Sequence, residues 1–206
     1  MARRLKAAER KASILAVAKI LFADKGYHGV SVDDIAVRLG VSPAVLYKHF
    51  SSKEALYEEV LNEIACRRES YVEAVLQEPD DFGSVLRRMT RLYVSSVARD
   101  PDYLRMELLS ILEGGSAERQ FFENRWKPFS DYIEVGLRDL VREQPMPMIE
   151  GRVASLLFRG MVREALLAKC ISRTEPYREF ELPELVDQLI EMFFRAIGYE
   201  NESAVA

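Results

Sequence analysis

The sequence predicts an all-α protein of about nine helices, with a small three-helix domain at the N-terminus and a larger helical body after it. Apolar residues recur at helical spacing, and no segment shows the two-residue alternation of a strand. Charge is divided unevenly: residues 1–53 carry ten Lys or Arg against four Asp or Glu, a net charge of +6, which leaves −10 for residues 54–206. A basic head on an acidic body is typical of a DNA-reading domain attached to a part that does not touch DNA.

Composition sets the class of protein. The chain has 206 residues, of which 49% are apolar and 30% charged, as in ordinary globular proteins. It has no apolar run of membrane-spanning length, and its first residues lack the apolar stretch of a signal peptide. Cys66 and Cys170 are far apart in sequence, which favours two reduced thiols over a disulfide. We therefore expect a cytoplasmic protein without membrane contact.

Helices are expected in order from the periodicity and from Gly and Pro punctuation. They fall at about residues 9–24, 32–39, 43–50, from 53 toward 76, 82–98, 102–112, 116–142, 149–170 and 183–197. Breaks are expected at Pro79, Pro101, Gly114-Gly115, the 144–147 loop and Gly198, and a kink at Pro128. Residues 1–10 form a basic arm, either solvated or in contact with DNA. The domain boundary is placed between residues 52 and 53.

The stretch from Ser31 to Lys53 carries the clearest local signals. Ser31 is expected to cap the helix that follows it, and Gly40 to end that helix with a positive φ. Ser42 is expected to cap the next helix, with Pro43 at its first position. Two short helices joined by a glycine-containing turn form a helix-turn-helix, whose second helix enters the major groove of DNA.

Residues 10–56 resemble the DNA-binding domain of the tetracycline-repressor (TetR) family. The matching residues are Gly26-Tyr27, Ser31-Val32, Ile35-Ala36, Gly40-Val41-Ser42, Leu46-Tyr47, His49-Phe50 and Lys53. The resemblance implies a homodimer that binds a near-palindromic double-stranded DNA operator and represses transcription. It also implies a small molecule that binds in the body and releases the operator. Family members often have Gly near residue 44 and a hydroxyl residue near 45, where this chain has Ala and Val, so the operator is not implied.

Candidate DNA contacts lie along the second helix of the motif and just after it. Tyr47, His49 and Lys53 are expected to contact phosphates, and Lys53 in particular because a cation at a helix N-terminus opposes the helix dipole. Base-edge contacts are expected from Ser42, Pro43, Ala44, Val45 and Lys48, with Ser31 a further candidate DNA contact. Lys48 has the reach to hydrogen-bond guanine, and Ala44 and Val45 can touch thymine methyl groups.

Catalysis is not expected. The chain has two histidines, His28 and His49, and lacks a zinc-protease motif, paired cysteines, a phosphate-binding glycine loop or a Ser/His/Asp order. We therefore predict no catalytic residue, metal site or cofactor. An alternative is a constitutive or architectural DNA-binding protein without an effector; the helical body of about 150 residues argues against it, because DNA binding needs far less protein.

The last two helices are predicted to form the dimer. Helix 183–197 has an apolar stripe wider than one core contact needs, and helix 149–170 adds Met161 and, at Gly160, room for close approach. Phe193 and Met161 are the positions at which an Asp substitution is expected to give monomers. The alternative is a monomer whose core buries both helices.

An effector pocket is predicted among the body helices, which carry Tyr93, Met106, Phe122, Trp126, Phe129 and Phe158. The alternative is that these side chains simply fill the core. Arg152, Arg159 and Arg163 share one helix face, which is explained by exposure or by pairing with Asp187, Glu191 or acids of helix 116–142. If Arg159 points inward instead, an acidic group on a mostly apolar ligand would pair with it.

Overall fold

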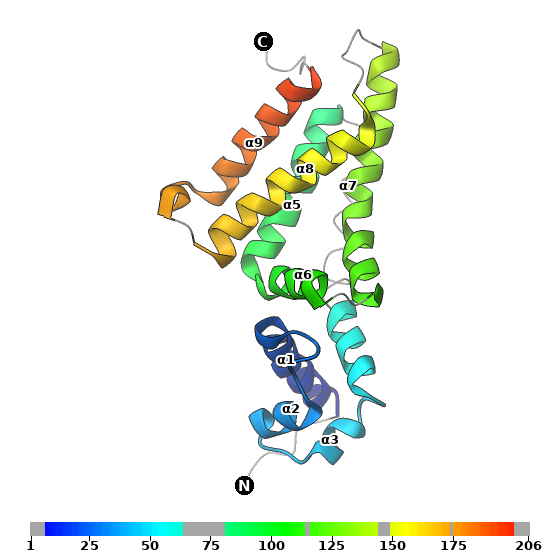
Figure 1. Ribbon diagram of the computed structural model, residues 1–206, viewed down its shortest axis with the longest axis vertical. Helices are drawn as coiled ribbons and strands as arrows, with labels where there is room; N and C mark the ends of the chain where they lie inside the picture. Colours follow the sequence, from blue (N-terminus) through cyan, green and yellow to red (C-terminus); the bar gives the residue numbers. More distant parts are fainter. Residues whose placement is uncertain (1–6, 64–80, 114–115, 144–148, 174, 200–206) are drawn as a thin grey trace. The chain divides into compact units, whose positions relative to one another are not determined.

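The computed structural model describes residues 7–63, 81–113, 116–143, 149–173 and 175–199, with backbone only at 116–122, 125 and 143. All regular elements in these ranges are helical, which confirms the predicted all-α class (Figure 1). The chain packs as two compact units, residues 1–67 with 102–119, and residues 68–101 with 120–206. The functional boundary between residues 52 and 53 stays a prediction.

The first unit contains the helix-turn-helix. It comprises α1 (Ala7–Lys25), α2 (Val32–Leu39), α3 (Pro43–Tyr47), a helical segment at residues 53–63, and α6 (Asp102–Glu113). Its core is fully buried at Ile14, Ala18, Phe22, Ile35, Leu46 and Leu56. The ring of Tyr57 meets Phe22 edge-on, with 4.8 Å between ring centres. Since aromatic rings prefer this edge-to-face arrangement, the pair ties the segment at 53–63 to α1.

Helix α6 belongs to the first unit although it follows α5 in sequence. It packs against α1 and buries Tyr103, Leu104 and Met106, all at most 1% exposed. Glu107, one turn on from Tyr103, is also buried. The small helix-turn-helix core is therefore extended by a helix from the middle of the chain.

The second unit is built from four long helices. They are α5 (Phe82–Arg99), α7 (Ser116–Glu143, whose first turn lies in the first unit), α8 (Gly151–Leu166) and α9 (Leu182–Ile197). Helix α8 lies beside α9, and α5 packs against both (Figure 1). The core is formed by Leu86, Met89, Tyr93, Phe129, Ile133, Phe158, Val162, Ile190 and Phe193. Each helix thus has one buried stripe, as the apolar periodicity predicted.

Helix ends agree with the sequence in most places. Asp81 caps α5 by accepting the N–H of Ser84 at 3.0 Å, and Gly198 ends α9 with a φ of 71°. Helix α7 runs through Pro128 without ending. The predicted α-helix to residue 170 is a difference: α8 ends at Leu166, and Leu167–Ile171 form a π-helical turn. A short 3₁₀ turn, Glu175–Tyr177, then leads into α9.

Several predicted features lie outside the described residues. These are the arm at 1–6, the helix from 64 toward 76 with its break at Pro79, Gly114-Gly115, the 144–147 loop and Cys66. Cys170 is a free thiol, and burial raises the pKa of its sulfhydryl. Within the described ranges, no helix is both long enough and apolar enough to cross a membrane.

Candidate functional site

The first helix of the motif begins at a capping box. The Ser31 hydroxyl accepts the N–H of Asp34 at 3.0 Å, and the Asp34 carboxylate accepts both the Ser31 N–H at 2.8 Å and its hydroxyl proton at 2.6 Å. These bonds from the Ser31 hydroxyl and backbone lower the pKa of Asp34. Gly40 ends the helix with a φ of 68°, as predicted. Both donors of Ser31 go to Asp34, so a direct phosphate contact from Ser31 stays a prediction and would require its hydroxyl to leave that carboxylate.

The second helix starts where it was predicted to start, but by a different contact. Ser42 occupies the N-cap position and Pro43 the first turn, yet the Ser42 hydroxyl makes no capping hydrogen bond. Its backbone carbonyl accepts the N–H of Val45 at 2.9 Å instead. The predicted side-chain cap at Ser42 is therefore wrong, and its hydroxyl is exposed.

One face of α3 is left open to solvent. Ala44, Tyr47 and Lys48 are exposed, Tyr47 at 56%, and their spacing of three and four residues places them on one side of the helix. Leu46 and Phe50 are buried on the other side. The exposed face therefore combines a small residue, a phenol and an ammonium group, which are side chains suited to reading a base edge and contacting phosphate.

Three candidate residues of this stretch are half-buried: Pro43 in the first turn of α3, Val45 and His49. The aliphatic side chain of Val45 is partly accessible to solvent. His49 lies beside the Phe50 ring, with 6.4 Å between ring centres. On α1, the ammonium of Lys11 lies 5.7 Å from the centre of the same Phe50 ring and pairs with Glu59 at 2.6 Å. The flank of α3 is thus anchored to both α1 and the segment at 53–63.

Lys53 was expected to have an anionic partner, and within the protein its ammonium lies over an aromatic ring. The Lys53 Nζ atom is 4.2 Å from the centre of the Tyr27 ring. The Tyr27 hydroxyl donates to the carboxylate of Glu54 at 2.6 Å, and this bond, more than any other influence, lowers the pKa of Glu54 to about 2. Tyr27 was not among the predicted site residues. The signal that could have identified it is an aromatic residue directly after the Gly26 that ends α1.

The predicted effector residues are divided between the two units. Met106 is buried in the first unit, and the Phe122 side chain lies outside the described residues. Tyr93, Trp126, Phe129 and Phe158 form one buried aromatic cluster in the second unit, with ring centres 4.9–6.0 Å apart. The cluster continues through Phe158 to Phe193 at 5.1 Å. These four rings contact one another and exclude water. A pocket at this place would have to form by separating the rings.

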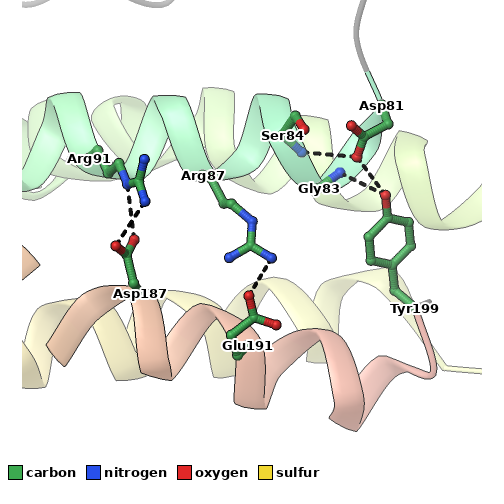
Figure 2. Close-up of polar contacts among 8 residues, drawn as sticks. All are labelled: Asp81, Gly83, Ser84, Arg87, Arg91, Asp187, Glu191 and Tyr199. Carbon is green, nitrogen blue, oxygen red and sulfur yellow. Dashed lines mark hydrogen bonds and ion pairs between the residues drawn. The ribbon is translucent and has the colours of Figure 1, made fainter. Parts of the chain in front are cut away.

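The arginines of α8 do not pair with the α9 acids that sequence analysis offered them. Asp187 accepts a two-pronged bond from Arg91 of α5, at 3.0 and 2.8 Å, and Glu191 pairs with Arg87 at 2.5 Å (Figure 2). Arg152 pairs with Glu150 just before α8. Arg159 is half-buried, and no acidic group of the described residues pairs with it.

A third contact lies at the end of the same seam between α5 and α9. The Tyr199 hydroxyl donates to Asp81 at 2.6 Å and accepts the N–H of Gly83 at 3.2 Å (Figure 2). Burial, the largest influence, pushes the pKa of Asp81 upward, but bonds from Ser84, Tyr199 and Gly83 together lower it to about 2. Burial and the bond to Asp81 raise the pKa of Tyr199 to about 12.

The outer side of α8 exposes several apolar side chains, and α9 adds Met192. Val153, Leu156, Leu157 and Met192 are 47–62% exposed, and a Cβ added at Gly160 would meet no atom within 4 Å. A neighbouring apolar hollow of about 190 Å³ is lined mainly by Met161, Ala165, Leu185 and Leu189. Phe193, chosen from the sequence as an interface position, is wrong in that role, because its side chain is 0% exposed inside the unit.

A helix-turn-helix that presents small, aromatic and basic side chains on its second helix defines a DNA-binding transcription regulator. The model of the bacterial regulatory proteins of the tetR family matches residues 14–60. The nucleoid occlusion factor SlmA of Sodalis glossinidius is 30% identical over 194 residues, which cover 87% of this chain and 94% of SlmA. The chain belongs to the TetR family, whose regulators are DNA-binding proteins rather than enzymes.

Other similar proteins extend over different shares of the chain. The transcriptional activator FasR of Mycolicibacterium smegmatis is 37% identical over 103 residues, 50% of this chain but 47% of FasR. Among solved structures, FadR of Bacillus subtilis in complex with stearoyl-CoA has a TM-score of 0.68 at 18% identity, covering 88% of this chain and 96% of FadR. AibR in complex with isovaleryl coenzyme A and operator DNA has a TM-score of 0.68 at 23% identity, with coverages of 89% and 97%. At these identities the two structures share the fold.

Proposed function

We propose that the protein is a ligand-responsive repressor that binds a near-palindromic operator as a homodimer and is released by a small, mostly apolar effector. The observation that carries the DNA-binding part is the open face of α3, with Ala44, Tyr47 and Lys48 exposed on a helix whose other side is buried. Since the operator lies on the chromosome, the protein acts in the cytoplasm.

The proposed DNA contacts divide into two groups. Tyr47, His49 and Lys53 contact phosphates and fix the position of the head on the duplex. Base edges are read by Ser42, Pro43, Ala44, Val45 and Lys48, with Lys48 as the residue that hydrogen-bonds guanine. The exposed hydroxyl of Ser42, free of any capping bond, supports its place in the second group.

The proposed homodimer forms through the outer faces of α8 and α9. Val153, Leu156, Leu157 and Met192 supply apolar surface, and Gly160 lets a second helix approach closely. The hollow beside Met161 and Leu189 offers a place for a partner side chain. A symmetric pair buries the same patch on both subunits and holds two heads at a fixed separation, as a two-fold operator requires.

The proposed effector is an acyl-coenzyme A or a related hydrophobic acid. Two structures of the same fold were solved with stearoyl-CoA and isovaleryl coenzyme A, which supports this class of ligand. In this chain the aromatic cluster of Tyr93, Trp126, Phe129 and Phe158 would open around the acyl chain, and Arg159 would pair with the acidic part. Met106, which is buried in the first unit, and Phe122, whose side chain lies outside the described residues, stay predictions from the sequence.

A second candidate function is supported by the similarity to SlmA. That relative is named a nucleoid occlusion factor, and its match extends over 87% of this chain. In this case the protein would bind its chromosomal sites constitutively, with no small molecule to release them. Effector titration separates the two functions, because only a ligand-responsive protein has an operator affinity coupled to the ligand.

The first experiment selects bound DNA from random sequence with the full-length protein. We expect a two-fold symmetric site, and Lys48→Ala should relax the preference at one base position per half-site. Tyr47→Ala and Lys53→Ala should instead weaken binding to all sequences about equally and lower its salt dependence. A purified protein without preference over random DNA at moderate salt would contradict the proposal.

The second experiment titrates acyl-coenzyme A compounds of increasing chain length, and the matching free acids, against the protein–operator complex. Release is expected for at least one chain length, and Arg159→Met should require more ligand. Arg178→Met is the matched control, since Arg178 is exposed and pairs with Glu175. If no compound changes operator affinity, the constitutive function is favoured; equal release from the Arg159→Met variant would remove Arg159 from the site.

A further inference from the structure

The last residue of α6 lies against the turn that ends α1. The Glu113 carboxylate accepts the backbone N–H of Tyr27 at 3.1 Å. Gly26, one residue earlier, has a φ of 73°, and a Cβ at that position would overlap the same carboxylate. The turn therefore needs glycine at position 26 for two reasons: its backbone conformation, and the space that the Glu113 side chain occupies.

Tyr27 connects this turn to the start of the segment at 53–63. Its N–H is held by Glu113, its hydroxyl by Glu54, and its ring lies under the ammonium of Lys53. The ring is itself packed against Tyr57 of that segment, with 5.0 Å between centres. Tyr27 thus contacts Glu113 at the end of α6, and it contacts Glu54 and Tyr57 in the segment that begins with Lys53.

The position of Lys53 explains why such support matters. Lys53 begins its helix, where the positive end of the helix dipole disfavours a cation. Glu54 beside it would compete with a phosphate for the ammonium. The Tyr27 ring stabilises the ammonium, and the Tyr27 hydroxyl holds the Glu54 carboxylate at a fixed place.

We propose that Tyr27 and Glu113 are positioning residues for the phosphate contact of Lys53, so that a carboxylate on α6 sets the affinity of the head for DNA. This inference rests on the proposed role of Lys53. Neither Tyr27 nor Glu113 touches DNA in this arrangement; each acts through Lys53. Their contribution is therefore to general affinity and its salt dependence, and not to base preference.

A double-mutant cycle on the 206-residue protein tests the proposal. Operator and random-DNA affinities are measured at several salt concentrations for wild type, Glu113→Ala, Lys53→Ala and the double variant. Glu113→Ala is expected to weaken both kinds of DNA about threefold to tenfold and to reduce the salt slope by about one phosphate contact. In the Lys53→Ala background the same substitution should have no further effect.

Two further variants separate positioning from a general effect on folding. Glu113→Gln keeps a carbonyl oxygen that can accept the Tyr27 N–H and should restore most of the affinity. Asp102→Ala, at the other end of α6, removes an ion pair with Arg105 and should leave DNA binding unchanged. If Glu113→Ala does not fold, Tyr27→Phe, which keeps the ring and the backbone N–H but removes the hydroxyl that bonds Glu54, is measured in both Lys53 backgrounds.

The proposal would be overturned if Glu113→Ala weakened DNA binding as much in the Lys53→Ala background as in wild type. A Glu113→Ala variant that binds DNA like wild type would also overturn it. So would a Glu113→Ala loss that changes base preference. The failure of DNA recognition itself looks different: wild type would then show no salt-dependent binding, and Lys53→Ala would have no effect on its own.

Discussion

The two units of the molecule expose different kinds of surface. In the first unit the open face of α3 combines Ala44, Tyr47 and Lys48, which are small, aromatic and basic. In the second unit the open faces of α8 and α9 present aliphatic side chains such as Leu157 and Met192. Desolvating a lysine in a protein interface is costly, whereas exposed apolar patches are favourable to cover with another apolar surface. The comparison is consistent with the proposed partners, operator DNA for the first unit and a second copy of the chain for the second.

Polar contacts are also used differently in the two units. In the first unit they hold individual side chains and turns close to the predicted DNA contacts, as in Ser31 with Asp34 and Tyr27 with Glu54. In the second unit they form a row along α5 and α9, with Asp187 and Glu191 among the members, and fix the two helices relative to each other (Figure 2).

The first prediction compares the effect on stability of a substitution in the core of the second unit with that of one on its surface. Phe158 is fully buried, and Leu157 beside it is 47% exposed. Phe158→Ala should lower the free energy of unfolding by about 3–5 kcal/mol, because it leaves a cavity among aromatic rings. Val135→Ala, at a position 50% exposed on α7, is the control and should change it by at most about 0.5 kcal/mol. Urea denaturation measures both; similar values for the two variants would contradict the assigned core.

The second prediction breaks the apolar face. Leu157→Asp should leave the helical content unchanged but give monomers in sedimentation, because dimer formation would bury an unpaired carboxylate. Operator affinity should fall about a hundredfold, since the two heads would no longer be linked. A Leu157→Asp protein that still sediments as a dimer would move the interface elsewhere.

The third prediction concerns the contact between Tyr199 and Asp81. Tyr199→Phe should lower the free energy of unfolding by about 2 kcal/mol near neutral pH, because a partly buried carboxylate loses a donor. Folding lowers the pKa of Asp81 to about 2, so its contribution is complete above about pH 4 and is lost as the pH falls toward 2. Folding raises the pKa of Tyr199 to about 12, so its contribution persists up to about pH 10.

The difference between wild type and Tyr199→Phe should therefore be constant from about pH 5 to 9 and shrink at pH 3. Chemical denaturation at these pH values checks this. Tyr177→Phe is the matched control, since Tyr177 is exposed, and it should show no such dependence. A difference that grows on acidification would show that the bond to Asp81 is not its source.

The fourth prediction compares two serines at the starts of neighbouring helices. Ser31→Ala should cost about 1 kcal/mol of stability, because its hydroxyl caps α2. Ser42→Ala should change stability by less than about 0.5 kcal/mol, because the Ser42 hydroxyl makes no capping bond. If Ser42 reads a base edge, its variant should instead alter DNA preference, which the selection experiment detects.

Local features of the fold could be predicted from the sequence. The cap at Ser31, the left-handed Gly40 and the exposed and buried sides of α3 all depend on residues within one or two turns of each other. Spacing indicates such interactions, although the side-chain cap expected by the same reasoning at Ser42 is absent. The open face of α3, which carries the proposed DNA contacts, belongs to this class.

Contacts between distant segments could not be predicted in the same way. The partners of Asp187 and Glu191 on α5 depend on how helices pack, and several arginines were equally suitable. The stripe of α9 is wide because one side of it is core, and periodicity cannot tell that Phe193 is inside while Met192 is outside. Lys53 has its partner in Tyr27, which is 26 residues away, through an attraction that leaves no charge pattern in the sequence.

The membership of α6 in the first unit bears on how such proteins can be recombined. The DNA-reading unit is not a continuous piece of the gene, because residues 102–119 belong to it while residues 68–101 do not. A hybrid that joins residues 1–52 of this chain to the body of a relative would pair α1 with a foreign α6. The space that Gly26 leaves for the Glu113 carboxylate would then face whatever residue the foreign helix carries at that position. A functional hybrid must therefore transfer residues 1–67 and 102–119 together. The structural unit for DNA recognition is larger than the helix-turn-helix, and it is not continuous in sequence.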